Sequence, residues 1–182
     1  MTLTEVFDTI ALVGKAAGCP ERAAVYIKHL EGRVSRVSEA TAMLREDEKP
    51  SVGFLEWIDP PFNAGHWTPE IIELAGGIDS FGTKHQPSRT ISDEVLIEAD
   101  PDVLIIALCG FNEQRAAEDM EILANRIDLK RLKAHQKGQI HVLDGNSLFS
   151  RPGPRLVDSL GVLVDILHPG LMKSPNGGPV AV

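Results

Sequence analysis

EWIDPPFNAGHW, residues 56–67, is the stretch that decides the fold, and it follows directly on an apolar run that begins at Val52. It holds both tryptophans of the chain, Trp57 and Trp67. The sequence Asp59-Pro60-Pro61 ends the preceding strand, because proline lacks the amide proton that a sheet ladder needs and restricts the residue before it. We therefore predict a loop that leaves the end of a strand. In open α/β sheets, ligands bind just outside such strand ends.

Downstream of this segment, strand-like and helix-like patterns alternate. Short apolar runs rich in β-branched residues predict parallel strands covered on both faces, at 52–57, 103–108 and 140–143, with a shorter strand near 78–81. Between them we predict helices over 69–75, 93–99, 113–126 and 154–167. Thr68 and Ser92 are the expected N-caps of the first two, and Gly76-Gly77 is the expected stop of the first. The fold class is therefore α/β, a parallel sheet with helices on both faces.

Upstream of the first strand the pattern is purely helical. Apolar residues at helical spacing predict a helix over 4–17 that ends at Gly18. Pro20 suits the first turn of a second helix, whose apolar positions recur at three- and four-residue steps as far as Leu44. Its length is about 25 residues, or about 40 Å, which suits a strut between two bodies. The apolar stripe of this strut has little to pack against at its N-terminal end.

The composition and charge of the chain indicate which kinds of partner it can bind and in which cellular compartment it is expected. The chain has 182 residues and a formal net charge of -8, which disfavours nucleic acid and anionic membranes as partners. No apolar run approaches the ~20 residues of a membrane span. No export signal is visible at the N-terminus, so we expect the chain as written to be cytoplasmic. Cys19 and Cys109 are far apart, and two unpaired buried thiols are expected rather than a disulfide.

Further short motifs are spaced along the chain after residues 56–67. They are Pro69-Glu70, Ala75-Gly76-Gly77, Ser92-x-Glu94, Ala99-Asp100-Pro101-Asp102, Cys109-Gly110-Phe111, Asp144-Gly145 and the sequence RPGPRLVD at 151–158. In this order, over roughly residues 5–168, the chain resembles the helical-backbone (class III) periplasmic binding proteins of ABC importers. These proteins bind cobalamin, iron-siderophores or haem, and the resemblance is greatest to the cobalamin-binding branch.

The resemblance implies two Rossmann-like lobes that are joined by one long helix, with the ligand between them. Residues 1–49 would then be the N-terminal helix and the strut, 50–169 the second, ligand-binding lobe, and 170–182 a loose tail. The family's first lobe and its export signal would precede Met1, and a longer protein of this kind would be periplasmic or at the cell surface. The implied function is non-catalytic capture of a cobalamin-type ligand, with no cofactor, followed by handover to the permease of an ABC importer. Glu94 matches the position at which the family presents a glutamate to arginines of the permease, although it could equally be an acid that favours a helix N-terminus.

Aromatic side chains are the first candidates for ligand binding. A corrin offers a broad face and many amide groups, so its site needs aromatic plates and few charges. Trp67, in the loop beyond the strand, is expected to face the cleft, whereas Trp57 could face the cleft or the core. Phe62 is either a cleft wall or a plug beneath the loop. Phe111 could stack on the ligand, since Gly110 permits a close approach of the backbone.

Polar candidates flank these aromatic residues. Cys109 follows an apolar strand and is expected to be a buried thiol; a catalytic role would need His135 or His141 nearby. Arg151 and Arg155 could hold a ligand amide, phosphate or carboxylate, or could pair with Asp144 or Asp158. His66 could ligate a metal, but a hydrogen-bonded loop histidine is the expected reading.

Several alternatives stay open at this point. A metal-binding enzyme or chelatase-like protein on the same lobe would use His66, Asp59 and Cys109. A siderophore or haem could replace cobalamin as the ligand. The chain could also be a truncated reading frame with no independent role, or form a homodimer through the uncovered stripe of the strut.

Overall fold

A sheet built around strand β1 (Ser51–Ile58) forms the centre of the computed structural model, which describes residues 1–172. β1 pairs in parallel with β4 (Val103–Ile106), and β4 pairs in parallel with β5 (Ile140–Val142). The other edge of β1 is shared between two short strands. β3 (Ile78–Asp79) runs parallel to its first residues, and β2 (Pro61–Asn63) runs antiparallel to its last. The carboxyl ends of β1, β4 and β5 therefore lie at one edge, where residues 56–67 begin.

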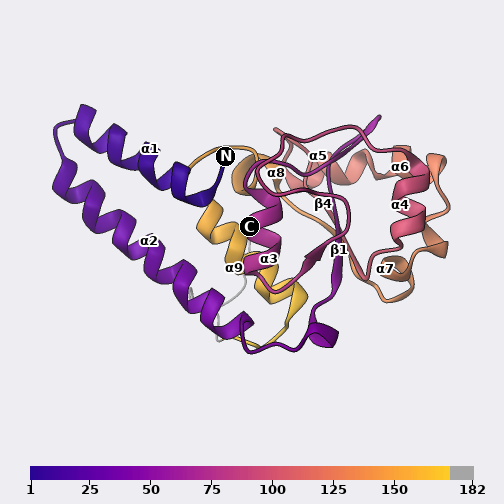
Figure 1. The fold of residues 1–182 in the computed structure, drawn as a ribbon. Helices are drawn as coiled ribbons and strands as arrows, with labels where there is room; N and C mark the ends of the chain where they lie inside the picture. Colours follow the sequence, from indigo (N-terminus) through magenta and orange to yellow (C-terminus); the bar gives the residue numbers. More distant parts are fainter. Residues whose placement is uncertain (173–182) are drawn as a thin grey trace.

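The two faces of the sheet are both covered by helices, as Figure 1 shows. α3 (Thr68–Leu74) and α9 (Leu156–Leu167) cover one face, and α4 (Asp93–Ala99), α5 (Glu113–Glu118), α6 (Met120–Arg126) and α7 (Lys133–Gln136) cover the other. Alternate residues of β4 explain why both faces are apolar: Val103 and Ile105 pack with α3 and α9, and Leu104 and Ile106 pack with α4 to α7. Short helices η1 (Glu46–Glu48), η2 (Leu129–Arg131) and α8 (Gly145–Leu148) complete the described chain.

The strut belongs to a helical hairpin. α1 (Leu3–Ala16) and α2 (Pro20–Thr41) are joined by a turn at Gly18, whose φ of +72° favours glycine. A Cβ added at Gly14 would lie 2.3 Å from the Ala23 Cβ, so the two backbones approach as closely as glycine allows. The hairpin leans on the α9 side of the sheet and projects away from it (Figure 1).

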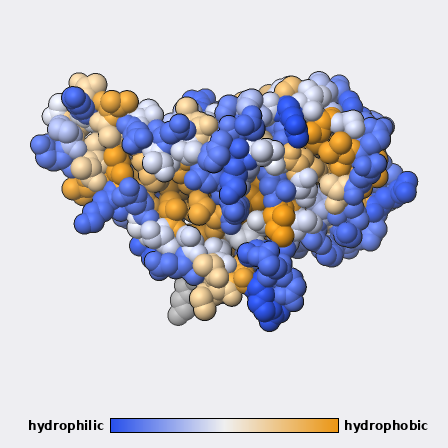
Figure 2. Space-filling model, viewed as in Figure 1, coloured by the Kyte–Doolittle hydropathy of each residue, from blue (hydrophilic) through white to orange (hydrophobic). Residues whose placement is uncertain are grey.

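The packing of α1 on α2 corrects the expectation that the N-terminal end of the strut has little to pack against. Phe7 of α1 and Leu30 of α2 are buried together against Val157 of α9, so the N-terminal half of the strut does have a partner. The strut is also shorter than expected, at 22 residues or about 33 Å. The far end of the hairpin nevertheless exposes four large side chains, Leu12, Val13, Val25 and Tyr26. Figure 2 shows patches of hydrophobic surface at that end of the molecule.

The predicted α/β class is confirmed, and the differences are local. The loop expected after Asp59 returns as strand β2, because its backbone pairs with the end of β1. The helix expected over 113–126 is divided at Asp119 into α5 and α6. Neither expected N-cap accepts a capping hydrogen bond on its side-chain oxygen. Trp67, not Thr68, occupies the N-cap of α3, and Ser92 stands at the N-cap of α4 as predicted but without a capping bond. The expected stop at Gly76 is present, with φ +80°.

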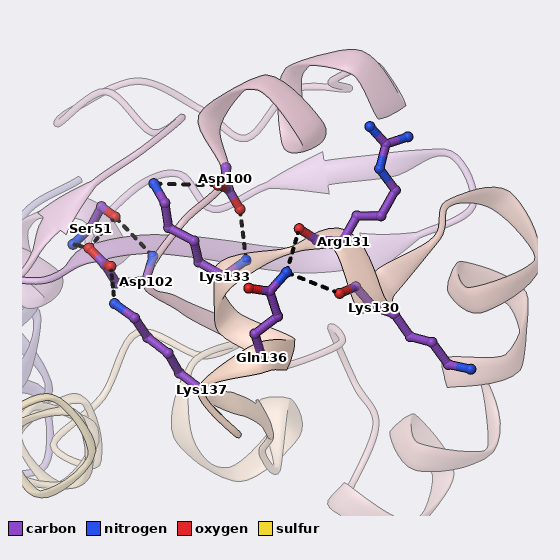
Figure 3. Close-up of polar contacts among 8 residues, drawn as sticks. All are labelled: Ser51, Asp100, Asp102, Lys130, Arg131, Lys133, Gln136 and Lys137. Carbon is purple, nitrogen blue, oxygen red and sulfur yellow. Dashed lines mark hydrogen bonds and ion pairs between the residues drawn. The ribbon is translucent and has the colours of Figure 1, made fainter.

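At the amino edge of the sheet, a polar network joins the starts of β1 and β4 (Figure 3). The Ser51 amide and hydroxyl both donate to Asp102 Oδ2, at 3.1 and 2.8 Å, and the Asp102 amide donates back to Ser51 Oγ at 2.9 Å. Lys137 Nζ donates to the other carboxylate oxygen of Asp102 at 2.7 Å. Asp100 and Lys133 form a neighbouring pair. This network is structural, since it lies at the edge opposite residues 56–67.

Two further findings concern the length of the helices and the C-terminal tail. None of the helices within residues 1–172 is long and apolar enough to cross a membrane. The greater part of the tail that the sequence predicts to be loose, residues 173–182, lies outside the described part of the chain.

Candidate functional site

A cavity of about 210 Å³ opens at the carboxyl edge of the sheet, beyond the ends of β1 and β4. Its lining comes from four separate parts of the sequence, near residues 54–56, 65–68, 107–109 and 149–150. The lining residues are Phe54, Glu56, Gly65, His66, Trp67, Thr68, Ala107, Cys109, Phe149 and Ser150. The site therefore stands where ligands bind in open α/β sheets.

Strand register sets the floor of this cavity. Beyond the last residue of β4, the Ala107 amide donates to the Leu55 carbonyl oxygen at 3.0 Å and the Cys109 amide donates to the Glu56 carbonyl oxygen at 3.0 Å. The ladder between β1 and its neighbour thus continues past Ile106. It brings the carboxylate of Glu56 and the thiol of Cys109 to the same cavity, although the residues are far apart in sequence.

One wall is the loop that carries His66. The His66 backbone has φ +57°, and its amide donates to the Gln86 carbonyl oxygen at 2.8 Å. A Cβ at Gly65 would lie 2.2 Å from the Ser88 nitrogen, so only glycine fits where the two loops touch. Buried Asn63 holds the same loops together, because its amide donates to the Phe81 carbonyl and its oxygen accepts from the Arg89 amide.

Trp67 forms an adjacent wall and is largely buried. Its indole is 8% exposed, and the indole N–H donates to the Phe149 carbonyl oxygen at 2.8 Å. The Phe149 ring meets Phe54 edge to face at 5.0 Å between centroids. The expectation that Trp67 faces the cleft holds only in part, because one part of the ring lines the cavity while the rest belongs to the core.

The opposite wall follows α8. A Cβ at Gly145 would lie 2.2 Å from the Leu108 carbonyl oxygen, so the turn into α8 lies directly against the end of β4. Ser150 Oγ donates to the Gly145 carbonyl oxygen at 2.8 Å and accepts from the Gly110 amide at 3.2 Å. These bonds hold Ser150 at the mouth of the cavity, and Gly110, with φ +80°, turns the chain away from it.

Glu56 supplies the charge of the site. Burial raises its pKa above the usual value, and Ser88, His66 and the Gly65 amide oppose that shift. None of the lining residues is Lys or Arg. The cavity therefore offers a partly desolvated hydrogen-bond acceptor with no fixed positive charge beside it.

A second feature lies outside the cavity, on the other face of β1. Trp57 follows Glu56 in the strand and so points to the opposite side; it is 36% exposed. Its ring meets Phe111 at 5.4 Å between centroids, and the Arg115 guanidinium lies 4.8 Å over the Phe111 ring. Half-buried Phe62 stands opposite Trp57 in the ladder between β1 and β2. We call Trp57, Phe62 and Phe111 the aromatic platform.

The remaining predicted residues are dispersed. Exposed Arg151 donates to Asn146 Oδ1 at 2.9 Å rather than pairing with Asp144, whose carboxylate caps α8 through Ser147. Exposed Arg155 occupies the N-cap of α9 and does not line the cavity. Its suggested partner Asp158 instead pairs with Arg33 of α2 at 2.7 Å.

Glu94 is exposed in the first turn of α4, where a hydrogen bond with Ser92 lowers its pKa. The neighbouring Asp93 forms an ion pair with Arg126, and Arg126 also pairs with Asp59. The tip of the β1–β2 hairpin and the start of α4 are therefore tied to the end of α6.

The thiols differ from expectation. Cys109 is exposed and Cys19 is half-buried, so neither is the buried thiol that the apolar context predicted. Of the histidines considered as bases for Cys109, His141 lies within β5 and bonds to Gln139, and His135 precedes β5 at the amino edge. In the described residues no three His, Cys, Asp or Glu side chains are grouped as metal ligands, and Asp59 is paired with Arg126.

Three larger hollows among the described residues lie away from the strand ends, and one of them, of about 550 Å³, is formed on α2 by residues that include Val25 and Tyr26. One of about 560 Å³ lies between α1, α2 and the start of α3, with Phe7, Ile27 and Glu70 among its lining residues. Another, of about 530 Å³, lies between η1, α3 and the loop after β3. None of them lies at the carboxyl ends of the strands, where ligands bind in open α/β sheets.

Sequence reasoning missed Glu56, Phe149 and Ser150 as site residues. Glu56 carried a usable signal, because a carboxylate at the end of an otherwise apolar strand needs a reason to be there. Phe149 and Ser150 carried none, since only the packing of α8 brings them to the cavity.

A family model and a curated relative both match most of this chain, and both belong to the same kind of protein. A model of the family described as "Periplasmic binding protein" matches residues 1–146. The chain is 20% identical over 174 residues to the uncharacterized ABC transporter substrate-binding lipoprotein YvrC of Bacillus subtilis, covering 94% of this chain and 52% of that protein. It thus spans about half the length of this curated relative.

Solved structures show the same fold. S. aureus IsdE complexed with heme superimposes with a TM-score of 0.79 at 16% identity, covering 92% of this chain and 65% of that one. The periplasmic vitamin B12 binding protein BtuF of Vibrio cholerae superimposes with a TM-score of 0.70 at 22% identity, covering 91% and 61%. This chain therefore matches a little under two thirds of each solved relative.

Proposed function

The chain belongs to the periplasmic binding protein family, and from this premise we propose that it is the ligand-gripping lobe of a substrate-binding component of an ABC importer. The observation that carries the proposal is the cavity at the carboxyl edge of the sheet, with Trp67 and Glu56 in its wall and the aromatic platform on the neighbouring face.

The ligand we propose is bulky, weakly charged and of the cobalamin type. The aromatic platform stands on the other face of β1 from the cavity, and we propose that a macrocycle lies across the carboxyl edge and reaches it with its broad face. The cavity lining is free of Lys and Arg, whereas the Arg115 guanidinium lies over the Phe111 ring of the platform, so it is the cavity that favours neutral substituents over carboxylates. Related structures carry heme in one case and bind vitamin B12 in another, so haem and iron chelates are the competing ligands.

Capture would use a second surface in addition to this one. We propose that residues 50–169 grip one side of the ligand while another lobe, supported by the α1–α2 hairpin of residues 1–49, covers the other side. Apolar burial contributes about 25 cal/mol per Å² of buried area, so a ligand held on one face only loses much of its affinity. We therefore expect weak binding of corrinoids by this chain alone.

Handover would use the start of α4. Exposed Glu94 is the proposed contact with the permease, and Arg126 fixes the preceding Asp93 against α6. A docking acid held in this way would present its charge at a constant position relative to the ligand site.

Tryptophan fluorescence tests the proposed ligand role, because Trp67 lines the cavity and Trp57 belongs to the aromatic platform. Cyanocobalamin, haemin and ferrioxamine are titrated separately, with N-acetyltryptophanamide correcting for absorption by the ligand. We expect saturable quenching by cyanocobalamin at micromolar or weaker affinity, which Trp57→Phe reduces most because Trp57 is the exposed indole.

Saturable quenching by haemin or ferrioxamine, but not by cyanocobalamin, would show that the ligand is not of the cobalamin type. The proposed binding role would then remain. The absence of saturable quenching by all three, up to about 1 mM ligand, would remove the binding role itself. Nanomolar affinity for cyanocobalamin by isothermal titration would contradict the need for a second lobe.

A further inference from the structure

We propose that the cavity around Glu56 is a subsite for one hydrogen-bond-donor group, a primary amide or an ammonium, that projects from the larger ligand. This inference rests on the proposed function in taking the ligand to be larger than the cavity. It assigns to Glu56 the choice between ligands that carry amides and ligands that carry carboxylates.

The size of the cavity sets the size of the group. Pockets that enclose a whole drug-sized ligand measure roughly 300–1,000 Å³, whereas this one measures about 210 Å³. A macrocycle cannot enter it. At about 30 Å³ per water-sized unit, the space admits roughly five to seven non-hydrogen atoms, the size of a propionamide side chain.

The polar groups of the wall set its chemistry. The Glu56 carboxylate accepts hydrogen bonds and donates none at neutral pH. The Ser150 hydroxyl already donates to the Gly145 carbonyl, so its proton is committed within the fold. The other titratable groups of the lining are His66 and Cys109. A ligand carboxylate placed here would face the charge of Glu56 without an opposing cation.

Because the Glu56 carboxylate is partly desolvated, it should favour a ligand group that donates a hydrogen bond. The carboxylate is partly removed from water, and this burial raises its pKa. A donor group in the cavity would replace the lost water contacts, while an ammonium would also supply the missing opposite charge. Glu56 is held in place for this task, since its carbonyl oxygen accepts from the Cys109 amide in the extended ladder.

Small fragments test the subsite directly, because they do not require a second lobe. Propionamide, propylammonium and propionate are each titrated into the full chain at neutral pH, and amide and indole N–H shifts of Gly65, His66 and Trp67 are followed by NMR. We expect saturable, millimolar shifts with propionamide and propylammonium, and propionate binding weaker by at least about tenfold because of charge repulsion with Glu56.

Glu56→Gln separates the two donor groups. It keeps an acceptor oxygen but removes the charge, so propylammonium affinity should fall at least about tenfold while propionamide affinity stays within about threefold. Glu121→Gln, at an exposed position on α6, is the matched control and should change neither. The wild-type comparison of the three fragments needs no variant, so it decides the question even if Glu56→Gln fails to fold.

Propionate binding as tightly as propionamide, or no saturable shift with any fragment, would overturn the subsite. Either result can occur while cyanocobalamin still quenches the tryptophans, in which case the binding role stands and the assignment of Glu56 fails. Conversely, fragment binding without any macrocycle binding would keep the subsite and remove the proposed ligand class.

Discussion

The amide of Cys109 donates to the carbonyl oxygen of Glu56 at 3.0 Å, three residues beyond the end of β4. This bond ties the turn at residues 109–110 to the end of β1, so the thiol stands on a turn that is anchored to the sheet beside the carboxylate. Sites built on regular elements hold their geometry more closely than sites built on loops. The carboxyl edge is therefore a preformed surface.

The exposure of Cys109 predicts selective alkylation. Iodoacetamide should modify Cys109 at least several times faster than the half-buried Cys19, because a thiol must be accessible to react. Peptide mass spectrometry over a time course measures both rates, and Cys109→Ser identifies the faster site. Carboxamidomethylated Cys109 should also block fragment binding in the cavity. Equal rates at the two thiols would show that the cavity mouth is closed in solution.

The buried indole of Trp67 predicts a large loss of stability on truncation. Trp67→Ala removes core packing and the bond to the Phe149 carbonyl, and should lower the free energy of unfolding by about 3–5 kcal/mol. Trp57→Ala, at a 36% exposed position, should cost clearly less. Urea denaturation of both variants gives the comparison. Similar losses would mean that Trp57, too, is part of the core.

Substituting alanine for each of two glycines should change the stability of the fold in opposite directions. Gly145→Ala places a Cβ 2.2 Å from the Leu108 carbonyl oxygen and should destabilise the fold by about 1–3 kcal/mol. Gly161→Ala, within helix α9, meets nothing within 4 Å and should stabilise by about 0.5–1 kcal/mol. Thermal and urea unfolding of the two variants should therefore shift in opposite directions. Shifts of the same sign would argue that α8 does not pack against β4.

Stability at acidic pH should depend on Asp102. Hydrogen bonds from Lys137, then from Ser51, lower its pKa to about 2 (Figure 3). Because the folded pKa lies below the unfolded value of 3.8, the stabilisation is complete above about pH 4 and is lost as the pH falls through about 2. Its size should be about 1 kcal/mol after allowance for solvent screening.

Asp102→Asn should flatten the fall in unfolding free energy between about pH 4 and pH 2. Urea titrations at several pH values measure that slope. Asp165→Asn, at an exposed site that forms no ion pair within residues 1–172, is the control and should keep it. An unchanged slope in Asp102→Asn would show that the network at the amino edge does not stabilise the fold.

The parts of the fold that depend on local pattern could be predicted. The apolar runs at 52–57 and 103–108 became β1 and β4, and Pro20 began α2 as expected. The short strand β2 could not be predicted, because three residues that include a proline form a strand only when a neighbour supplies the partner. The strut helix was predicted but is shorter than expected, and its cover by α1 follows from the turn at Gly18.

The site was predicted in outline and not in detail. The segment 56–67 indicated the correct edge of the sheet, yet it could not tell which of Trp57 and Trp67 is buried. Trp57 lies at the end of β1 against Phe111, whereas Trp67 lies at the start of α3 and donates to the Phe149 carbonyl, which is distant in sequence. The same limit applies to Arg155, whose suggested partner Asp158 is taken by Arg33 at 2.7 Å.

The close contact between Gly14 and Ala23 has a mechanical consequence. It joins α1 and α2 into one stiff body, which is tied to the sheet layer near its base, where Thr41 Oγ1 donates to the Leu74 carbonyl oxygen at 2.9 Å. Leu30 packs on Val157 of α9, so only the part of α2 before Leu30, about 16 Å long, projects beyond the sheet layer. A rotation of about 10° about Leu30 would carry the tip of the hairpin through roughly 3 Å.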